Sequence, residues 1–285
     1  MTKNKSKQII RILLFIGTII SLYFVPWPIV KAWITPMPNT VQEQVNKAAD
    51  YGFDGIIVCV NKNNNKSEFY TSGYKNKEKK IPANPNSLFK IASVSKLYTA
   101  LAIAKLVVDG HLSLDKTLYD YFPQLVGRIQ NAEKITVRMM VQHRSGIPNF
   151  TDTPNFWTNP PKNREETLKR ILDLPADFEP NSKYEYSNTN YLLLSQLIEK
   201  VTGKSKFQYI KENILEPLNL KNTFGSNNDV NLDDIMSGYY VGYKYDLKTE
   251  NKGVMLATAE DLSKFIRALN LSSINLCSQF QIIMA

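Results

Sequence analysis

Ser93 and Lys96 are the residues of this chain whose types and spacing most clearly suggest chemistry. Projected on a helix, the two share a face with Leu97, Ala100 and Ala104, so they lie at the front end of a buried stripe. A serine in the first helical turn is close to unpaired N–H groups and the positive end of the helix dipole, which suit a developing oxyanion. A lysine partly removed from water gives up its proton more readily and can activate the serine as a nucleophile.

A second group of polar side chains, Tyr186-Ser187-Asn188, immediately precedes a predicted helix whose buried face carries Tyr191 and Leu194. A nearby ammonium would favour the phenolate form of the tyrosine and let it relay protons. Asn188 could hold a substrate amide. Taken alone, each pattern also has a structural explanation, because Ser-x-x-Lys occurs by chance and asparagine is a preferred helix cap.

Composition excludes several classes of function. The 285 residues include 35 Lys+Arg and 26 Asp+Glu, for a net charge of +9, but Lys79-Lys80 is the longest basic run. Nucleic-acid binding usually needs clustered basic residues, so no nucleic-acid partner is predicted. Two cysteines and two histidines are too few for a typical zinc centre, and we predict neither metal nor cofactor. Cys59 lies in an apolar run and Cys277 in the tail, so both are predicted to be free.

The amino-terminal segment is typical of a membrane-insertion signal. An apolar stretch over residues 12–25, extended to Ile34, follows a basic segment that contains Lys3, Lys5, Lys7 and Arg11. This length is sufficient for a membrane span, and the basic residues favour a cytoplasmic amino terminus. We therefore predict a single-pass signal-anchor and linker over residues 1–38 and an extracytoplasmic domain over residues 39–285.

Cleavage of this segment is the alternative. Val30-Lys31-Ala32 resembles a small-residue cleavage site. Trp27 and Trp33 are typical of residues that anchor a span at the membrane interface, which favours a retained segment.

The remaining sequence predicts two strands followed by helices. β-rich runs over residues 55–60 and 67–73 indicate a β-hairpin. Helical patterns follow at residues 93–109, 136–142, 165–174, 189–201, 207–214 and 259–269. Gly203 is placed to end one helix, and Thr258 with Asp261 resembles a capping box that opens the last. Because strands and helices hardly alternate, we predict an α+β fold.

The order of these motifs resembles a known family. Ser93-Val94-Ser95-Lys96 followed by Tyr186-Ser187-Asn188 is similar to the first two motifs of the class C β-lactamase, D-alanyl-D-alanine carboxypeptidase and esterase group. Residues 135–148, 178–181 and 253–269 also resemble that group, and the resemblance extends from about residue 53 to residue 269 in the same order. Such a series is far more specific than any single motif.

The resemblance implies a β-lactamase/transpeptidase-like fold, in which a helical region packs on an antiparallel sheet. It implies that Ser93 is acylated, that Lys96 and Tyr186 manage the protons, and that Asn188 contacts the amide of the substrate. Whether Lys96 or Tyr186 accepts the serine proton stays open, as in related enzymes. His143 corresponds to a turn position of the family pattern and is predicted to be structural.

One family feature is absent from the sequence. The family carries a third motif, Lys-Thr-Gly or His-Thr-Gly, on a strand that lines the pocket. Lys200-Val201-Thr202-Gly203 lies at a helix end instead, and residues 270–285 resemble nothing in the family. The expectation is a C-terminally truncated copy whose sheet lacks its last strands. Loss of one oxyanion donor from that region would lower the rate roughly 10²- to 10³-fold.

The expected function is therefore that of a membrane-anchored serine hydrolase. Its substrate would be a D-alanyl-D-alanine-type peptide of peptidoglycan, a β-lactam, or a small ester or amide. The alternative is a non-catalytic, membrane-tethered binding or sensor protein that keeps the shell of the pocket. The retained serine and lysine favour the enzyme, whereas the missing third motif favours the alternative.

Overall fold

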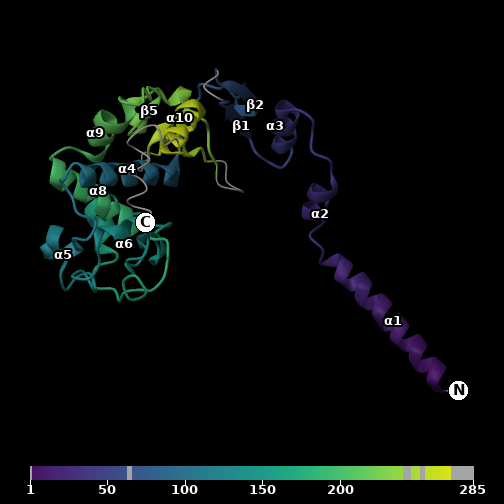
Figure 1. Ribbon diagram of the computed structural model, residues 1–285. Helices are drawn as coiled ribbons and strands as arrows, with labels where there is room; N and C mark the ends of the chain where they lie inside the picture. Colours follow the sequence, from purple (N-terminus) through teal and green to yellow (C-terminus); the bar gives the residue numbers. More distant parts are fainter. Residues whose placement is uncertain (1, 63–65, 240–244, 251–253, 271–285) are drawn as a thin grey trace. The chain divides into compact units, whose positions relative to one another are not determined.

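The computed structural model describes residues 2–62, 66–239, 245–250 and 254–270. The chain separates into two compact units, Met1–Gly52 and Phe53–Ala285. Figure 1 draws both units, and each is a separate body. The predicted division at residues 38 and 39 stays a prediction.

The first unit contains three helices, α1 (Thr2–Tyr23), α2 (Trp27–Ile34) and α3 (Val41–Ala49). Helix α3 begins with a complete capping box, in which Thr40 and Glu43 each accept a hydrogen bond from the other's backbone N–H. Within the described residues, no single helix has the length and apolarity of a membrane span. That length and apolarity are reached only by a pair of helical segments, Lys7–Tyr23 and Trp27–Ile34, which is bent by 81° at the break between the two segments.

A three-stranded antiparallel sheet opens the second unit. Its strands β1 (Gly55–Val60), β2 (Glu68–Asn76) and β3 (Ile81–Pro82) lie in chain order. The register pairs Gly55 with Gly73 and Val60 with Glu68, which confirms the predicted hairpin. Gly73 has φ +72°, and a Cβ atom there would lie 2.4 Å from the carbonyl oxygen of Asp54, so only glycine fits.

A second sheet, which the sequence did not indicate, consists of two-residue strands. Its order is β4 (Phe89–Lys90), β6 (Leu256–Ala257) and β5 (Thr223–Phe224), all antiparallel. The backbone N–H of Ile91 extends the β4–β6 pairing by donating to the carbonyl of Met255 at 3.0 Å. Strands this short show no alternation of apolar and polar residues, which is why a sequence pattern could not reveal them.

The main core forms around two helices, α4 (Ser95–Val108) and α8 (Asn188–Thr202). Leu101, Leu193 and Leu194 have no exposed surface, and burial of each such side chain contributes roughly 1.5–3 kcal/mol. Helix α8 ends at Gly203, whose φ of +69° confirms the predicted helix stop. The other helices are α5 (Leu118–Tyr121), α6 (Val137–Val141), α7 (Arg164–Lys169), α9 (Lys206–Ile210, continued by a wider turn over Lys211–Leu215) and α10 (Ala259–Asn270). Single helical turns lie at Ala92–Val94, Pro123–Leu125, Phe150–Asp152, Asn227–Asp229, Leu232–Asp234 and Leu247–Thr249.

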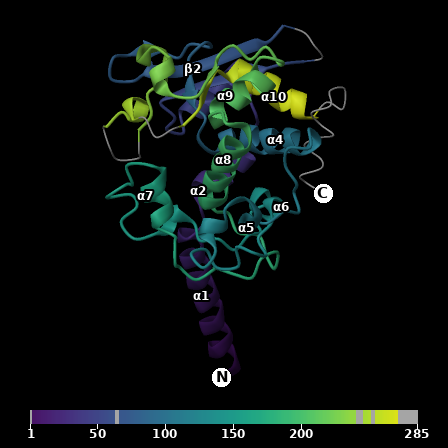
Figure 2. The same cartoon turned by 90° about the vertical axis from the view of Figure 1, so that its left-hand side faces the viewer.

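Figure 2 shows the layers of the second unit, with β2 and α10 at one end, α5 and α6 at the other, and α4 and α8 between them. Helix α10 packs on β1 and also reaches α4, where the rings of Phe265 and Tyr98 stack with centroids 3.7 Å apart. The α+β arrangement with helices beside antiparallel sheets is thus confirmed. Strand β4 belongs to the second sheet and α4 to the core. Both ends of the segment that joins them are therefore fixed.

The capping box predicted at the start of α10 is only half formed. The backbone N–H of Asp261 donates to the hydroxyl of Thr258 at 3.3 Å, as expected. The carboxylate of Asp261 instead accepts hydrogen bonds from the backbone of Asn222 at 2.7 Å and the hydroxyl of Thr223 at 3.0 Å. It therefore ties α10 to β5, a long-range contact that local sequence cannot reveal.

Candidate active site

Ser93 lies in a tight turn, Ala92–Val94, that joins β4 to α4. The helix proper begins at Ser95, so Ser93 lies two positions before it instead of within its first turn. Ala92 has φ +43°, a conformation that is strained for a residue with a side chain. Such strain often occurs where a backbone must present a reactive group. The turn leaves Ser93 exposed.

The hydroxyl of Ser93 is within hydrogen-bond reach of both predicted partners. Its Oγ atom lies 3.3 Å from Nζ of Lys96, which donates to it. It lies 3.0 Å from Oη of Tyr186, which is 93 positions farther along the chain. The structure thus brings the three predicted catalytic side chains together.

Asn188 completes a directional chain of hydrogen bonds. The phenol of Tyr186 donates to Oδ1 of Asn188 at 3.2 Å. Because that bond uses the only phenolic hydrogen, the consistent arrangement has Ser93 donating to Tyr186 and the ammonium of Lys96 donating to Ser93. The amide nitrogen of Asn188 donates to Oδ1 of Asn149 at 3.2 Å.

His143 positions the ring of Tyr186. The two rings stack with centroids 4.6 Å apart and an interplanar angle of 29°. Nδ1 of His143 accepts a hydrogen bond from the backbone N–H of Ser187 at 3.1 Å, so that nitrogen carries no proton. Burial, helped by the positive charge of Lys96, lowers the pKa of His143 to about 4. A neutral imidazole therefore supports the tyrosine at neutral pH.

The ammonium of Lys96 faces aromatic rings. It lies 5.0 Å from the ring centroid of Tyr186 and 5.8 Å from that of Tyr191. The phenol of Tyr191 donates to the carbonyl of Val141 at 3.1 Å, and burial raises its pKa, so it stays neutral. Among the described residues, no carboxylate forms an ion pair with Lys96. Its hydrogen-bonding capacity is directed at Ser93.

Ser93, Lys96 and Asn188 line a cavity of about 470 Å³. The rest of its wall includes residues that sequence reasoning missed, above all three aromatic side chains and a second lysine: Phe150, Phe156, Trp157 and Lys206. The aromatic residues lie in one short segment and were a detectable signal. The sequence gives no signal for Lys206, because a lysine at a helix start resembles any solvated surface residue.

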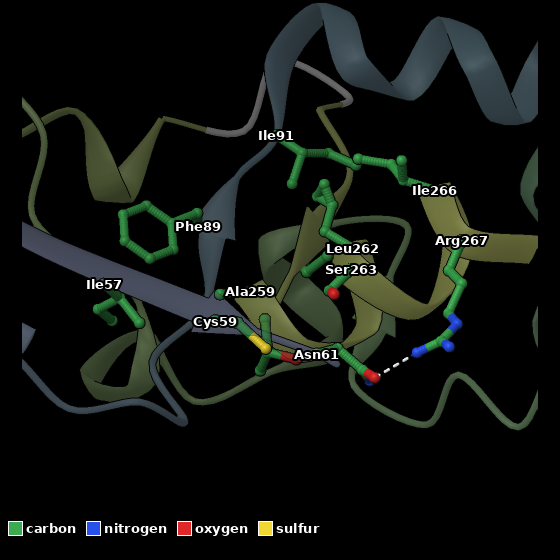
Figure 3. Close-up of a pocket in the computed structure, with 12 residues that line it drawn as sticks. Ile57, Cys59, Asn61, Phe89, Ile91, Ala259, Leu262, Ser263, Ile266 and Arg267 are labelled. Carbon is green, nitrogen blue, oxygen red and sulfur yellow. Dashed lines mark hydrogen bonds between the residues drawn. The ribbon is translucent and has the colours of Figure 1, made fainter. Parts of the chain in front are cut away.

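A second, larger cavity of about 630 Å³ lies between β1 and α10 and contains none of the predicted site residues. Figure 3 shows its mostly apolar wall, in which Cys59 lies near the hydrogen bond from Arg267 to Asn61. Cys59 is free, as predicted, whereas Cys277 lies outside the described residues.

These observations define a class of protein. A serine beside a lysine at the start of a buried helix, with a tyrosine from a distant loop, is the arrangement of a serine hydrolase with the transpeptidase fold. The profile of the Beta-lactamase family matches residues 37–278, so the chain belongs to the β-lactamase family.

Individual relatives agree with this assignment. The chain is 27% identical to "Protein flp" of Staphylococcus aureus strain N315, over 82% of this chain and 50% of that protein. It is 32% identical to "Penicillin-binding protein 4*" of Bacillus subtilis, over 64% of this chain and 40% of that protein. The structure is similar to D-amino acid amidase from Ochrobactrum anthropi SV3, with a TM-score of 0.69, 27% identity and coverage of 80% and 69% of the two chains. The chain spans about half the length of the curated relatives it matches first.

Proposed function

We propose that this protein hydrolyses its substrate through an acyl-enzyme on Ser93. The observation that carries the proposal is the contact of one serine oxygen with both Tyr186, at 3.0 Å, and Lys96, at 3.3 Å. A weak nucleophile needs an adjacent base, and both distances are within the reach of proton transfer.

In the proposed reaction, Oγ of Ser93 forms a bond with the carbonyl carbon of the substrate. The serine proton passes to the neutral amine of Lys96 or the phenolate of Tyr186, and that group returns it to the departing amine or alkoxide. A water molecule then attacks the ester, gives up a proton by the same route, and releases the acid and free Ser93. His143 stacks on the ring of Tyr186, and Oδ1 of Asn188 accepts a hydrogen bond from the phenol whenever Tyr186 carries its proton.

The proposed substrates are D-amino-acid amides and peptides, with β-lactams and small esters as further candidates. The names of two relatives, a D-amino acid amidase and a penicillin-binding protein, support this range. Asn188 is proposed to bind the substrate amide, since its long hydrogen bonds of 3.2 and 3.4 Å to Asn149 and Thr151 can be exchanged.

We also propose that the first unit tethers the enzyme to a membrane, with the second unit on the extracytoplasmic side. The basic segment before the apolar stretch and the exposed apolar side chains of α1 and α2 support this placement. Carbonate extraction of membranes from expressing cells tests it. The full chain should remain with the membrane pellet, and release into the supernatant would contradict tethering.

The substrate class is tested with the full-length chain in detergent micelles. We would measure kcat/KM for D- and L-phenylalanine p-nitroanilide, a chromogenic cephalosporin and p-nitrophenyl acetate. Ser93→Ala serves as the inactive variant and the exposed Ser182→Ala as its matched control. Turnover that prefers the D-enantiomer and is lost only in Ser93→Ala supports the proposal. A folded chain that turns over none of the four would favour the non-catalytic binding protein.

A further inference from the structure

The active-site cavity contains a second cation, Lys206, to which the reaction described above gives no role. We propose that Lys206 binds a carboxylate on the substrate, so that the enzyme prefers ligands with an apolar body and an anionic group. The inference deepens the proposed function and rests on it, because the same cavity must receive the substrate.

The backbone around Lys206 is fixed. Lys206 is the first residue of α9, which Ser205 caps by accepting a hydrogen bond from the backbone of Gln208 at 3.1 Å. The backbone N–H of Lys206 donates to the carboxylate of Glu199 at 3.3 Å. The side chain is partly buried and lines the cavity together with Ser93. These bonds fix the backbone from which the side chain of Lys206 reaches the wall of the cavity.

The ammonium of Lys206 has no partner among the described residues. Glu199, whose carboxylate accepts from the backbone N–H of Lys206, is already bound to Arg164, whose Nη1 atom lies 2.7 and 2.6 Å from its two oxygens. Burial lowers the pKa of Lys206, and the positive charges of Arg164 and Lys96 lower it further. The negative charge of Glu199 opposes this shift. A covered cation without a counter-ion is unfavourable, and a carboxylate from the ligand would relieve that cost.

The rest of the cavity also favours an anion with an apolar body. No acidic side chain of the described residues lines it, whereas both Lys96 and Lys206 do. Phe150, Phe156 and Trp157 form a connected aromatic wall, with ring centroids 5.5 Å apart for the first pair and 5.0 Å for the second. Aromatic side chains bind apolar groups, and the lysines supply the charge recognition.

The test compares two nearly isosteric ligands, 4-phenylbutyrate and 4-phenylbutyramide, by calorimetric titration of the full-length chain in detergent. We expect the acid to bind at least about tenfold more tightly than the amide, since a hydrogen bond between two charged groups is stronger than one to a neutral group. Lys206→Met should reduce this ratio to within about twofold, and Lys206→Arg should retain most of it. Lys211→Met, an exposed lysine next to α9, is the matched control and should keep the wild-type ratio.

Equal binding of acid and amide by the wild type, no measurable binding of either, or a preference that survives in Lys206→Met would overturn the inference. Labelling of Ser93 by a fluorophosphonate in the same preparations tests the proposed function separately. Labelling of Ser93 without preferential binding of the acid would contradict only the role of Lys206. Acid preference with an unreactive Ser93 would leave the anion site standing and remove the catalytic function.

Discussion

Two cavities of the second unit, that of Figure 3 and that of Ser93, show that volume alone does not identify a reactive site. The cavity of Figure 3 is the larger of the pair, at about 630 Å³ against 470 Å³. Its wall carries the thiol of Cys59 and the hydroxyls of Thr258 and Ser263, yet among the described residues none of them is hydrogen-bonded to a basic side chain. Two of its polar side chains, Arg267 and Asn61, are hydrogen-bonded to each other. The smaller cavity holds Ser93 with two proton carriers within 3.3 Å. Mutual orientation of polar groups, and not volume, identifies the reactive site.

The two cavities differ because different elements form their walls. The larger cavity is bounded by β1 and α10, which present mainly apolar side chains to each other. The smaller one lies where α4 and α8 begin, and helix starts supply unpaired N–H groups and loop side chains at fixed positions. Substitutions in the smaller cavity should therefore change reactivity, and those in the larger should change only stability.

The largest effect is expected for Lys96→Met. Removal of the amine that contacts Ser93 should slow phosphonylation by a fluorophosphonate roughly 10³-fold, within the range for a general base. Lys105→Met, on the same helix and outside the cavity, is the matched control. Second-order labelling rates provide the measurement, and similar rates in both variants would remove Lys96 from the mechanism.

Tyr186→Phe should give the next largest effect. The variant keeps the ring that stacks on His143 but loses the oxygen 3.0 Å from Ser93, so the labelling rate should fall about 10²-fold. Tyr184→Phe removes an exposed phenol two positions earlier and should label at the wild-type rate. An unchanged rate in Tyr186→Phe would leave Lys96 as the sole proton carrier.

The lowered pKa of His143 predicts that the stability of the protein depends on pH. Its folded-state pKa of about 4 lies below the ordinary value of 6.5, so the unfolded chain takes up the proton first as the pH falls. The stability that the neutral imidazole contributes is present above pH 6.5 and is lost between pH 6.5 and 4, by up to roughly 3 kcal/mol.

Urea unfolding at pH 7.5 and 4.5 measures this effect. The wild type and the exposed-histidine variant His111→Gln should lose stability in parallel, while His143→Gln should lose less. An identical loss in all three proteins would show that His143 is not the titrating group.

The smallest effect on reactivity is expected for Cys59→Ala. This change enlarges the cavity of Figure 3 and should lower the free energy of unfolding by about 1 kcal/mol. The labelling rate of Ser93 should change by less than about twofold, because distant sites act independently. Thermal unfolding and labelling of the same sample check both, and a tenfold slower rate would mean that the two cavities are coupled.

Sequence reasoning recovered the parts of the molecule that are local. Ser93 and Lys96 are three positions apart, so one helical turn sufficed to place them together, and the hairpin and the long helices followed from apolar periodicity. The contact of Ser93 with Tyr186 spans 93 positions and came only from the resemblance to the family. No local pattern could supply it.

The features that were missed depend on tertiary structure. The sheet of β4, β5 and β6 has strands too short for a pattern, and Asp261 caps a distant strand end instead of its own helix. Lys206 is distinctive only because Arg164 occupies the acid beside it. Such roles follow from partners brought together by folding, which neither composition nor spacing records.

The central claim is that Ser93 is an activated nucleophile, and intact mass spectrometry tests it most directly. The full-length chain would be treated with a fluorophosphonate beside Ser93→Ala and the control Ser182→Ala, with circular dichroism to establish that each is folded. The account predicts one stoichiometric adduct in the wild type and the control, and none in Ser93→Ala. A folded wild-type chain that forms no adduct, or an adduct that persists in Ser93→Ala, would contradict it.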